Sequence, residues 1–562
     1  MAVRPAGTRR PAGLKALLAT GWLALAALAA GPPAAASEAT AAAEAIRERV
    51  DIARDTGQLT LGGEAVVSRV GLTRLYSGLG FEPLWQAPGR IEQLLALVRE
   101  VADDGLTPAD YHLAALESLW SELRIRPTPE HVADLDVLAS DAYMLLLYHL
   151  HFGKVDPQSL EPTWNFSGRE VTGEQAVEFV ARAITSGRVR EAAQEARPAH
   201  WMYDHGRRAL RAYRAIEAQG GWPTVPDGPT LKPGMSDPRI VALRRRLAVT
   251  GDLMDQPLDL ELFDEPLAAA VRSFQERHLL TADAEVGRAT LRELNVPVAD
   301  RIRQIRVNLE RGRHVLHEIG GGRLIVVDIA GYQVRWIEDR RMTWSSRVVV
   351  GQPFRQTPTF RAQVEYLVFN PTWTVPPAIL QKDVLPGVRR NSRYLEQRGL
   401  EVLDRNGRPV DPAGIDWHRY TGRNFPYLLR QAAGDDNALG RVKIMFPNPH
   451  LVYLHDTPAR ALFERDDRAF SSGCIRVDRV FELVERLLAG TTWTREAIDA
   501  AVATGATRTV RLPQPVPVLL IYWTVDEDER GRIVFKRDVY DRDPSLAAAL
   551  DARFRFGARP TT

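Results

Sequence analysis

The stretch SSGCIRV, residues 471–477, contains Cys474, the only cysteine in a chain of 562 residues. A lone cysteine is most often a small buried hydrophobe. Here Gly473 precedes it, which lets backbone N–H groups approach a substrate, and Arg476 follows two positions later. An apolar pattern over residues 480–488 predicts a helix just beyond. A nearby cation and a helix N-terminus both lower a thiol pKa, so these surroundings indicate a reactive cysteine.

The segment HLVYLHDTP, residues 450–458, offers a base for this thiol. If the segment is a strand, Tyr453 and His455 share one face and His450 lies on the other. A neutral histidine can take the thiol proton and so activate a cysteine as a nucleophile. Eighteen residues separate His455 from Cys474, enough to bring two strand ends together. We therefore predict that the two residues form a nucleophile–base pair.

The N-terminus has the pattern of an export signal. Basic residues precede an apolar stretch, residues 16–30, and small residues with an A-x-A pattern follow it. The apolar stretch is shorter than the roughly 20 residues of a membrane span. We predict that residues 1–36 are a signal peptide or an N-terminal anchor, and that the protein is periplasmic. Any membrane contact is then expected only through this segment. In an oxidising compartment a single cysteine cannot form an intramolecular disulfide.

The composition excludes some partners. Lys and Arg total 73 against 71 Asp and Glu, so no charge excess points to nucleic acid. Hydrophobic residues make up 45% and charged residues 26%, as in soluble globular proteins. His149 and His151 are two positions apart on a predicted helix and therefore point to different faces, which argues against a metal site there. We expect neither a metal nor a cofactor.

Changes in hydrophobic periodicity divide the chain into a multidomain α+β protein. Helical spacing dominates the first half, and β-branched, aromatic runs dominate the second. Residues 386–440 are too long for an ordinary connection and predict a lid or binding loop. The predicted parts after the signal are a helical scaffold domain (37–226), a small three-helix domain (227–297), a helical connector (298–320), a β-rich catalytic domain (321–545) and a C-terminal tail (546–562).

The small helical domain resembles a peptidoglycan-binding domain of the three-helix type. The resemblance rests on Ile240, Leu243 and Leu247 at helical spacing, followed by AVRSFQERHLL and GRATLRELN. The Asp-Gly usual in its loop is Asp283-Ala284 here, so we expect that turn to be made differently. A plain helical spacer is the alternative interpretation.

The cysteine segment resembles the catalytic motif of L,D-transpeptidases of the YkuD type, in which a histidine is followed by Ser/Thr-His-Gly-Cys-x-Arg/Asn. Ser472 stands where most members have histidine, and SSGC is typical of the large Gram-negative YcbB-type branch. Asp328, where an asparagine is common, is a small departure. Other stretches resemble the same branch in the same order: FEPLW (81–85), DDGLTPADY (103–111), HFGKVDP (151–157), VGQPFRQTP (350–358), FNPTWTVP (369–376) and NALGRVKIMFPNPHLVYLHDTP (437–458).

The resemblance implies an enzyme with Cys474 as nucleophile and His455 as the base that activates it. It implies that backbone N–H groups of Gly473 and Cys474, with Tyr453 or Ser472, hold the oxyanion. Arg476 is expected to orient the loop or a substrate carboxylate. Further substrate-binding candidates are Trp373, Trp417, Phe425, Tyr427, Asn448 and Ser471.

The implied reaction rebuilds peptidoglycan cross-links and makes the protein a carbapenem target. The thiolate attacks the third residue of a tetrapeptide stem and expels D-alanine, and a meso-diaminopimelate amine of a second stem resolves the thioester into a 3→3 cross-link. Implied partners are peptidoglycan stem peptides and glycan, a glycan polymerase, and a D,D-carboxypeptidase that makes the tetrapeptide donor.

Three alternatives remain. A cysteine hydrolase would need its cysteine before its histidine, at the start of a helix, and the order here is the reverse. A non-catalytic wall-binding protein would be favoured if Cys474 or His455 were absent, and both are present. The same chemistry could instead serve a lipoprotein or D-amino acid acceptor.

Overall fold

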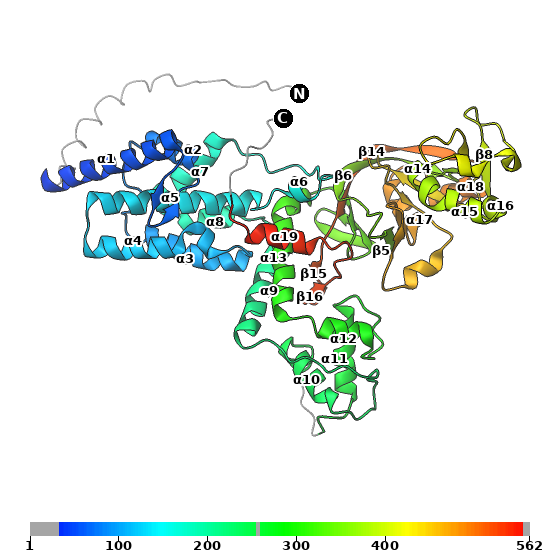
Figure 1. The fold of residues 1–562 in the computed structure, drawn as a ribbon, viewed down its shortest axis with the longest axis horizontal. Helices are drawn as coiled ribbons and strands as arrows, with labels where there is room; N and C mark the ends of the chain where they lie inside the picture. Colours follow the sequence, from blue (N-terminus) through cyan, green and yellow to red (C-terminus); the bar gives the residue numbers. More distant parts are fainter. Residues whose placement is uncertain (1–32, 255–258, 555–562) are drawn as a thin grey trace, which may run out of the picture. The chain divides into compact units, whose positions relative to one another are not determined.

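A computed structural model describes residues 33–254 and 259–554 of the chain (Figure 1). Most of the predicted export signal lies outside the described residues. No helix within the described ranges is long and apolar enough to cross a membrane. The chain divides into two compact units, and the first comprises residues 1–98, 111–145 and 172–192.

The first unit is built almost entirely from helices. Its packing is illustrated by Asp136, a buried residue whose carboxylate accepts hydrogen bonds from the backbone N–H groups of Leu84 and Trp85. This contact fixes the FEPLW stretch. The elements of the unit, some of which continue into the second, are α1 (Pro33–Thr56), β1 (Thr60–Leu61), β2 (Glu64–Ala65), α2 (Arg69–Gly78), α3 (Arg90–Glu100), α4 (Leu113–Ile125), α5 (Pro129–Phe152), α7 (Gly173–Thr185) and α8 (Val189–Ala196).

Three short helices with a core of their own form the predicted peptidoglycan-binding region of the second unit. They are α10 (Arg239–Val249), α11 (Glu265–Glu276) and α12 (Arg288–Leu294). Ala284 takes the left-handed conformation, with φ 63°, and is fully buried. The expectation that this turn is made differently without a glycine is therefore wrong, because Ala284 adopts the left-handed conformation that glycine favours.

A nine-stranded sheet forms the β-rich domain of the second unit (Figure 1). The strand order is β12-β5-β13-β11-β10-β6-β14-β3-β4, and an additional β4–β5 pairing closes the sheet on itself. The strands are β3 (Arg323–Asp328), β4 (Gln333–Glu338), β5 (Arg341–Gly351), β6 (Phe360–Phe369), β10 (Val442–Met445), β11 (Leu454–His455), β12 (Ala469–Ser471), β13 (Ile475–Val477) and β14 (Arg508–Ile521).

The two faces of this sheet differ because alternate residues point to opposite sides. Ile444, Leu454 and Ile475 belong to the large apolar core on one face. On the other face, β3 and β14 pack against a second apolar cluster that includes residues of α9 (Trp201–Ala218) and α13 (Val298–Val315).

The remaining elements complete the second unit. They are α6 (Pro157–Leu160), α17 (Val480–Leu487), α18 (Arg495–Ala503), β15 (Val525–Glu527), β16 (Ile533–Phe535) and α19 (Asp543–Asp551). Leu546 and Leu550 of α19 are buried, so the predicted C-terminal tail begins as a packed helix.

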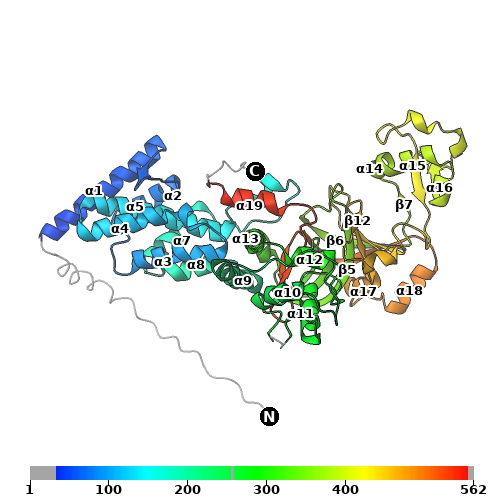
Figure 2. The same ribbon diagram turned by 60° about the horizontal axis from the view of Figure 1, so that its bottom comes forward.

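An insert subdomain, defined here as residues 375–431, covers most of the predicted lid. Its helices lie together in both ribbon views (Figure 2), and its apolar residues form a separate core. Its elements, together with β7 just before it, are β7 (Trp373–Thr374), α14 (Pro377–Ile379), a π-helical turn (Leu380–Val384), α15 (Leu385–Arg390), α16 (Tyr394–Gln397), β8 (Leu400–Leu403) and β9 (Leu428–Gln431). The three strands pair in the order β7-β9-β8.

We predict that Phe369→Ala destabilises the second unit. Phe369 is fully buried in the sheet core, and removing a buried phenyl ring costs about 3–5 kcal/mol in free energy of unfolding. Phe354→Ala is the matched control, because that ring is 69% exposed. Urea-induced unfolding followed by tryptophan fluorescence measures both. Equal losses of stability in the two variants would contradict the predicted core.

Candidate active site

Three neighbouring strands place three polar residues in one row on the face opposite the large core. Lys443 of β10 pairs with His455 of β11, and His455 pairs with Arg476 of β13. Residues in register share a face, and neighbouring strands lie about 4.8 Å apart. Tyr453 and Cys474 come two positions before His455 and Arg476, directly before β11 and β13, and the Ile475 N–H donates to the Tyr453 carbonyl at 3.0 Å, so we place them in the next row of the same face. The register thus pairs the predicted base with Arg476, two positions after the predicted nucleophile.

Cys474 lies directly before β13, and its thiol donates toward the Leu451 carbonyl at 3.7 Å. The prediction that it precedes a helix N-terminus is wrong, because β13 separates it from α17. Burial raises the thiol pKa above its ordinary value; hydrogen bonds from Tyr453 and the charges of Lys443 and Arg476 act in the opposite direction. The predicted lowering of the thiol pKa is therefore also wrong for the resting site.

His455 is buried, and its ring is held by the backbone. Nδ1 lies 2.5 Å from the Asp456 carbonyl oxygen. Because a carbonyl only accepts, Nδ1 carries the hydrogen and Nε2 keeps its lone pair. Burial, together with the positive charges of Arg476 and Lys443, lowers the pKa of His455 to about 3. His455 is therefore a neutral base at physiological pH, beside a neutral thiol.

The ring of Tyr453 completes this group. Its centroid lies 5.7 Å from that of His455 in an edge-on arrangement. The predicted shared face of these two residues is correct, although only Leu454 and His455 form the strand. Leu451 has φ 57° and a 73% exposed side chain, so the run before Leu454 does not continue as a strand. Burial and the charge of Cys474 raise the pKa of Tyr453.

The loop before Cys474 is shaped by its serines. Ser471 is buried; its hydroxyl donates to the Cys474 carbonyl at 2.5 Å and accepts from the Gly473 N–H at 3.1 Å. The Gly473 N–H is thus occupied, whereas the Cys474 N–H has no partner in the described part of the chain. Gly473 has φ 113°, a conformation that L side chains rarely adopt.

A second loop, residues 351–358, links the insert subdomain to the cysteine loop. Arg355 forms a bidentate ion pair with Asp383 of the π-helical turn, at 2.5 and 2.9 Å, and also donates to Ser472 Oγ at 2.8 Å. Thr357 donates to the Gly473 carbonyl at 2.9 Å. Ser472 stands where the motif usually has histidine. Its hydroxyl accepts a hydrogen bond from Arg355, which is itself ion-paired with Asp383 of the insert.

The other predicted substrate-binding residues are placed less directly. Asn448 uses its side chain within its own loop, accepting from the N–H groups of His450 and Val452 and donating to the Phe446 and Val452 carbonyls. Trp373 lies within hydrogen-bonding reach of Tyr453. Three aromatic residues pack against the core of the insert and against one another: Trp417, Phe425 and Tyr427.

Sequence reasoning missed Lys443 and Arg355. The alternation Val442-Lys443-Ile444 signals that Lys443 faces away from the core, but no sequence pattern tells which strand lies beside it. Arg355 lies 28 residues from Asp383 and 117 from Ser472, distances that only the folded chain closes.

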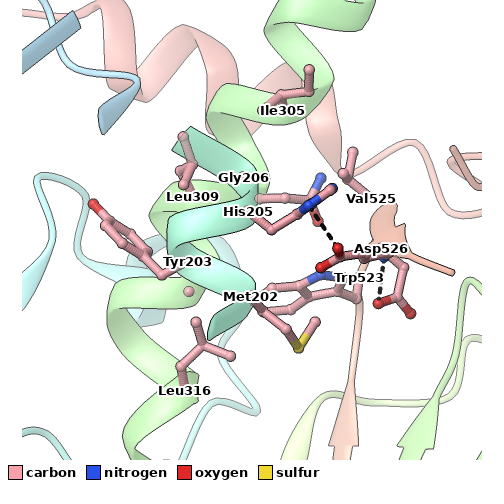
Figure 3. Close-up of a pocket in the computed structure, with 13 residues that line it drawn as sticks. Met202, Tyr203, His205, Gly206, Ile305, Leu309, Leu316, Trp523, Val525 and Asp526 are labelled. Atoms are coloured by element: carbon pink, nitrogen blue, oxygen red, sulfur yellow. Dashed lines mark hydrogen bonds and ion pairs between the residues drawn. The ribbon is translucent and has the colours of Figure 1, made fainter. Parts of the chain in front are cut away.

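The second unit also contains a pocket that is not lined by any of the site residues described above. A pocket of about 20 Å³ between α9, α13 and β15 is lined mainly by apolar side chains, with His205 Nδ1 3.0 Å from Glu527 Oε1 (Figure 3). It has room for about one water molecule. Among the described residues no group of three or more His, Cys, Asp or Glu is arranged to hold a metal ion.

Family comparisons assign three segments of the chain. Residues 71–210 match a "Scaffold domain", residues 236–294 a "Putative peptidoglycan binding domain", and residues 322–500 an "L,D-transpeptidase catalytic domain". The last segment contains the whole row of polar residues described above.

One curated protein and two solved structures are similar to parts of this chain. A "Putative L,D-transpeptidase" from Haemophilus influenzae is 37% identical over 225 residues, which is 40% of this chain and 45% of that protein. The match thus spans less than half of the relative's length. Solved L,D-transpeptidase structures from Xylanimonas cellulosilytica and Stackebrandtia nassauensis are 14% and 12% identical, each over 53% of this chain, and cover 99% and 96% of their own chains. Their TM-scores of 0.16 and 0.20 are too low to indicate a shared arrangement. Residues 322–500 of this chain are an L,D-transpeptidase catalytic domain, and residues 236–294 are a peptidoglycan-binding domain.

Proposed function

We propose that the protein is a periplasmic L,D-transpeptidase that forms 3→3 cross-links in peptidoglycan, with Cys474 as nucleophile and His455 as base. The observation that supports this most is the register of β11 and β13, which gives His455 and Cys474 a common face. The match of residues 322–500 to the catalytic domain of this enzyme class supports the reaction type. The order of the stretches that resemble the YcbB-type branch, together with Ser472, favours that branch.

In the acylation half-reaction, His455 Nε2 takes the thiol proton as Cys474 Sγ attacks the carbonyl carbon of the third stem residue. The negative charge that develops on the carbonyl oxygen is stabilised by hydrogen-bond donors, for which the Cys474 N–H and the Tyr453 hydroxyl are available. The C–N bond then breaks, and the proton on His455 passes to the amine of the departing D-alanine. A thioester on Cys474 remains.

In the second half-reaction, the side-chain amine of a meso-diaminopimelate residue on a neighbouring stem attacks the thioester carbon. His455 accepts the proton of that amine, the new C–N bond forms, and the C–S bond breaks. The thiolate then regains a proton from His455. Water competes with the amine for the same thioester, so yield depends on excluding water. The insert subdomain acts as the lid, held to the cysteine loop through Arg355.

The other domains fit a wall enzyme. The peptidoglycan-binding domain keeps the protein at its substrate, glycan and stem peptides. Residues 1–36 direct export, and a glycan polymerase and a D,D-carboxypeptidase supply strands and tetrapeptide donors. A lipoprotein or D-amino acid acceptor uses the same acyl-enzyme and differs only in the second step.

The test is Cys474→Ala in the full chain, incubated with tetrapeptide muropeptides. We expect the wild type to give 3→3 dimers and the variant none, because no thioester can form. Mass spectrometry of the muropeptides measures this, and addition of a carbapenem's mass to wild type alone identifies the acylated thiol. Unchanged dimer yield in the variant would refute the enzyme assignment.

The pKa shifts predict how thiol reactivity depends on pH. Burial raises the pKa of Cys474 and lowers that of His455 to about 3. We expect alkylation by iodoacetamide to be slow at neutral pH and to keep rising above pH of about 8.5, the ordinary thiol value, with no step near a histidine value of about 6.5. Protein unfolded in urea is the control and should show the ordinary thiol profile. A plateau of fast alkylation between pH 5 and 7 would instead mean a preformed thiolate–imidazolium pair.

The Arg355 contacts predict a change in product ratio. Arg355→Ala removes the bidentate tie to Asp383 and the contact with Ser472, so the insert loses its anchor on the cysteine loop. We expect thioester hydrolysis to increase several-fold relative to cross-linking, measured as free tripeptide against 3→3 dimer. Arg355→Lys should restore part of the ratio, because lysine keeps the charge without the fork geometry. Arg393→Ala, which breaks an exposed pair with Glu396 in the same insert, is the matched control and should leave the ratio unchanged.

A further inference from the structure

Two cations beside the thiol have no anion to balance them. Neither Lys443 nor Arg476 forms an ion pair with any carboxylate in the described part of the chain, and the Arg476 Nε is buried without a hydrogen-bond partner. Two other cations of this domain are paired: Arg355 with Asp383 and Arg335 with Asp526. Both unpaired side chains are half-buried.

The positions of the two head groups are constrained by the sheet. Lys443 and Arg476 flank His455 on neighbouring strands. Lys443 Nζ lies 4.5 Å from the centroid of the Tyr453 ring, so its stem turns toward the row that holds Cys474. Arg476 lies in β13, two positions after Cys474, which directly precedes that strand.

Leaving two partly desolvated cations on either side of one histidine is unfavourable unless an anion joins them. Burial lowers the pKa of both Lys443 and Arg476, and only Cys474 acts in the opposite direction. The thiol does not fill this role at rest, since its own pKa is raised. The site is therefore complementary to an anion brought by the substrate.

We propose that Lys443 and Arg476 bind the α-carboxylate of the leaving residue, and thereby select donor stems that end at residue four. This inference rests on the proposed function. In such a donor the carboxylate is about one residue step, 3.8 Å, from the scissile carbonyl that contacts Sγ. A stem with a fifth residue carries its carboxylate one step further away, and an amidated stem has no charge to offer.

The experiment compares three stem donors with the full-length wild type. One ends in D-alanine with a free carboxylate, the second ends in D-alaninamide, and the third has a free terminus but an amide on the D-centre carboxylate of its meso-diaminopimelate. The measured quantity is kcat/KM for release of the fourth residue, with the acyl-enzyme followed by mass. We expect the terminal amide to lower kcat/KM roughly 10- to 100-fold, the range for hydrogen bonds to charged groups, and the D-centre amide to leave it within a few-fold.

Variants show whether these two side chains carry the preference. Lys443→Met and Arg476→Gln should lose rate on the free-acid donor but little on the terminal amide, so the preference collapses. A purely structural role would lower both rates together. Lys443→Arg should retain the preference, and Arg495→Gln, a surface residue paired with Glu485 and Asp499, is the matched control. Thermal unfolding and iodoacetamide alkylation verify the fold and the thiol of each variant.

The outcomes separate this inference from the proposed function. Equal wild-type rates on the free acid and the terminal amide overturn the carboxylate site while leaving the transpeptidase assignment intact. A loss confined to the D-centre amide means that a different carboxylate is bound and also overturns it. Failure of every donor to acylate Cys474 overturns the proposed function itself. The wild-type comparison needs no substitution, so a variant that fails to fold does not weaken it.

Discussion

The pairing of β11 with β13 is the contact on which the rest of the site depends. Only two residue pairs define it, Leu454 with Ile475 and His455 with Arg476. A slip of one residue would turn His455 into the apolar core and bring Leu454 to the outer face. The apolar partners prevent that slip, because Leu454 and Ile475 are both fully buried in the core. Core packing thus fixes the orientation of residues that do not belong to the core.

The electrostatics of the resting site follow from this placement. Burial opposes charge on both Cys474 and His455, so the thiol stays protonated and the imidazole stays neutral. A neutral thiol is poorly reactive until a substrate arrives, which would protect it from oxidation in the periplasmic location that we propose. In our proposal the substrate contributes the negative charge that Lys443 and Arg476 lack.

The insert subdomain is joined to the site by one guanidinium group. Arg355 contacts both Asp383 and Ser472, so a movement of the insert would reach the loop before the nucleophile. A serine leaves room for this contact at the position of the usual histidine. Ser472, which departs from the common motif, thus contacts Arg355 of a different loop.

The sequence by itself determined the order of domains and the β-rich character of the catalytic part, and it predicted Cys474 as nucleophile and His455 as base. These depend on local periodicity and on a short motif, both of which are written in consecutive residues. The sequence correctly predicted a helix over residues 480–488, but it was wrong to place Cys474 directly before that helix, because β13 lies between them, and it was wrong about the direction of the thiol pKa shift. It also missed Lys443 and Arg355. Strand neighbours, burial, an ion pair over 28 residues and a hydrogen bond over 117 residues depend on how distant segments pack. Only the tertiary structure decided them, because desolvation and register arise when segments far apart in the chain meet.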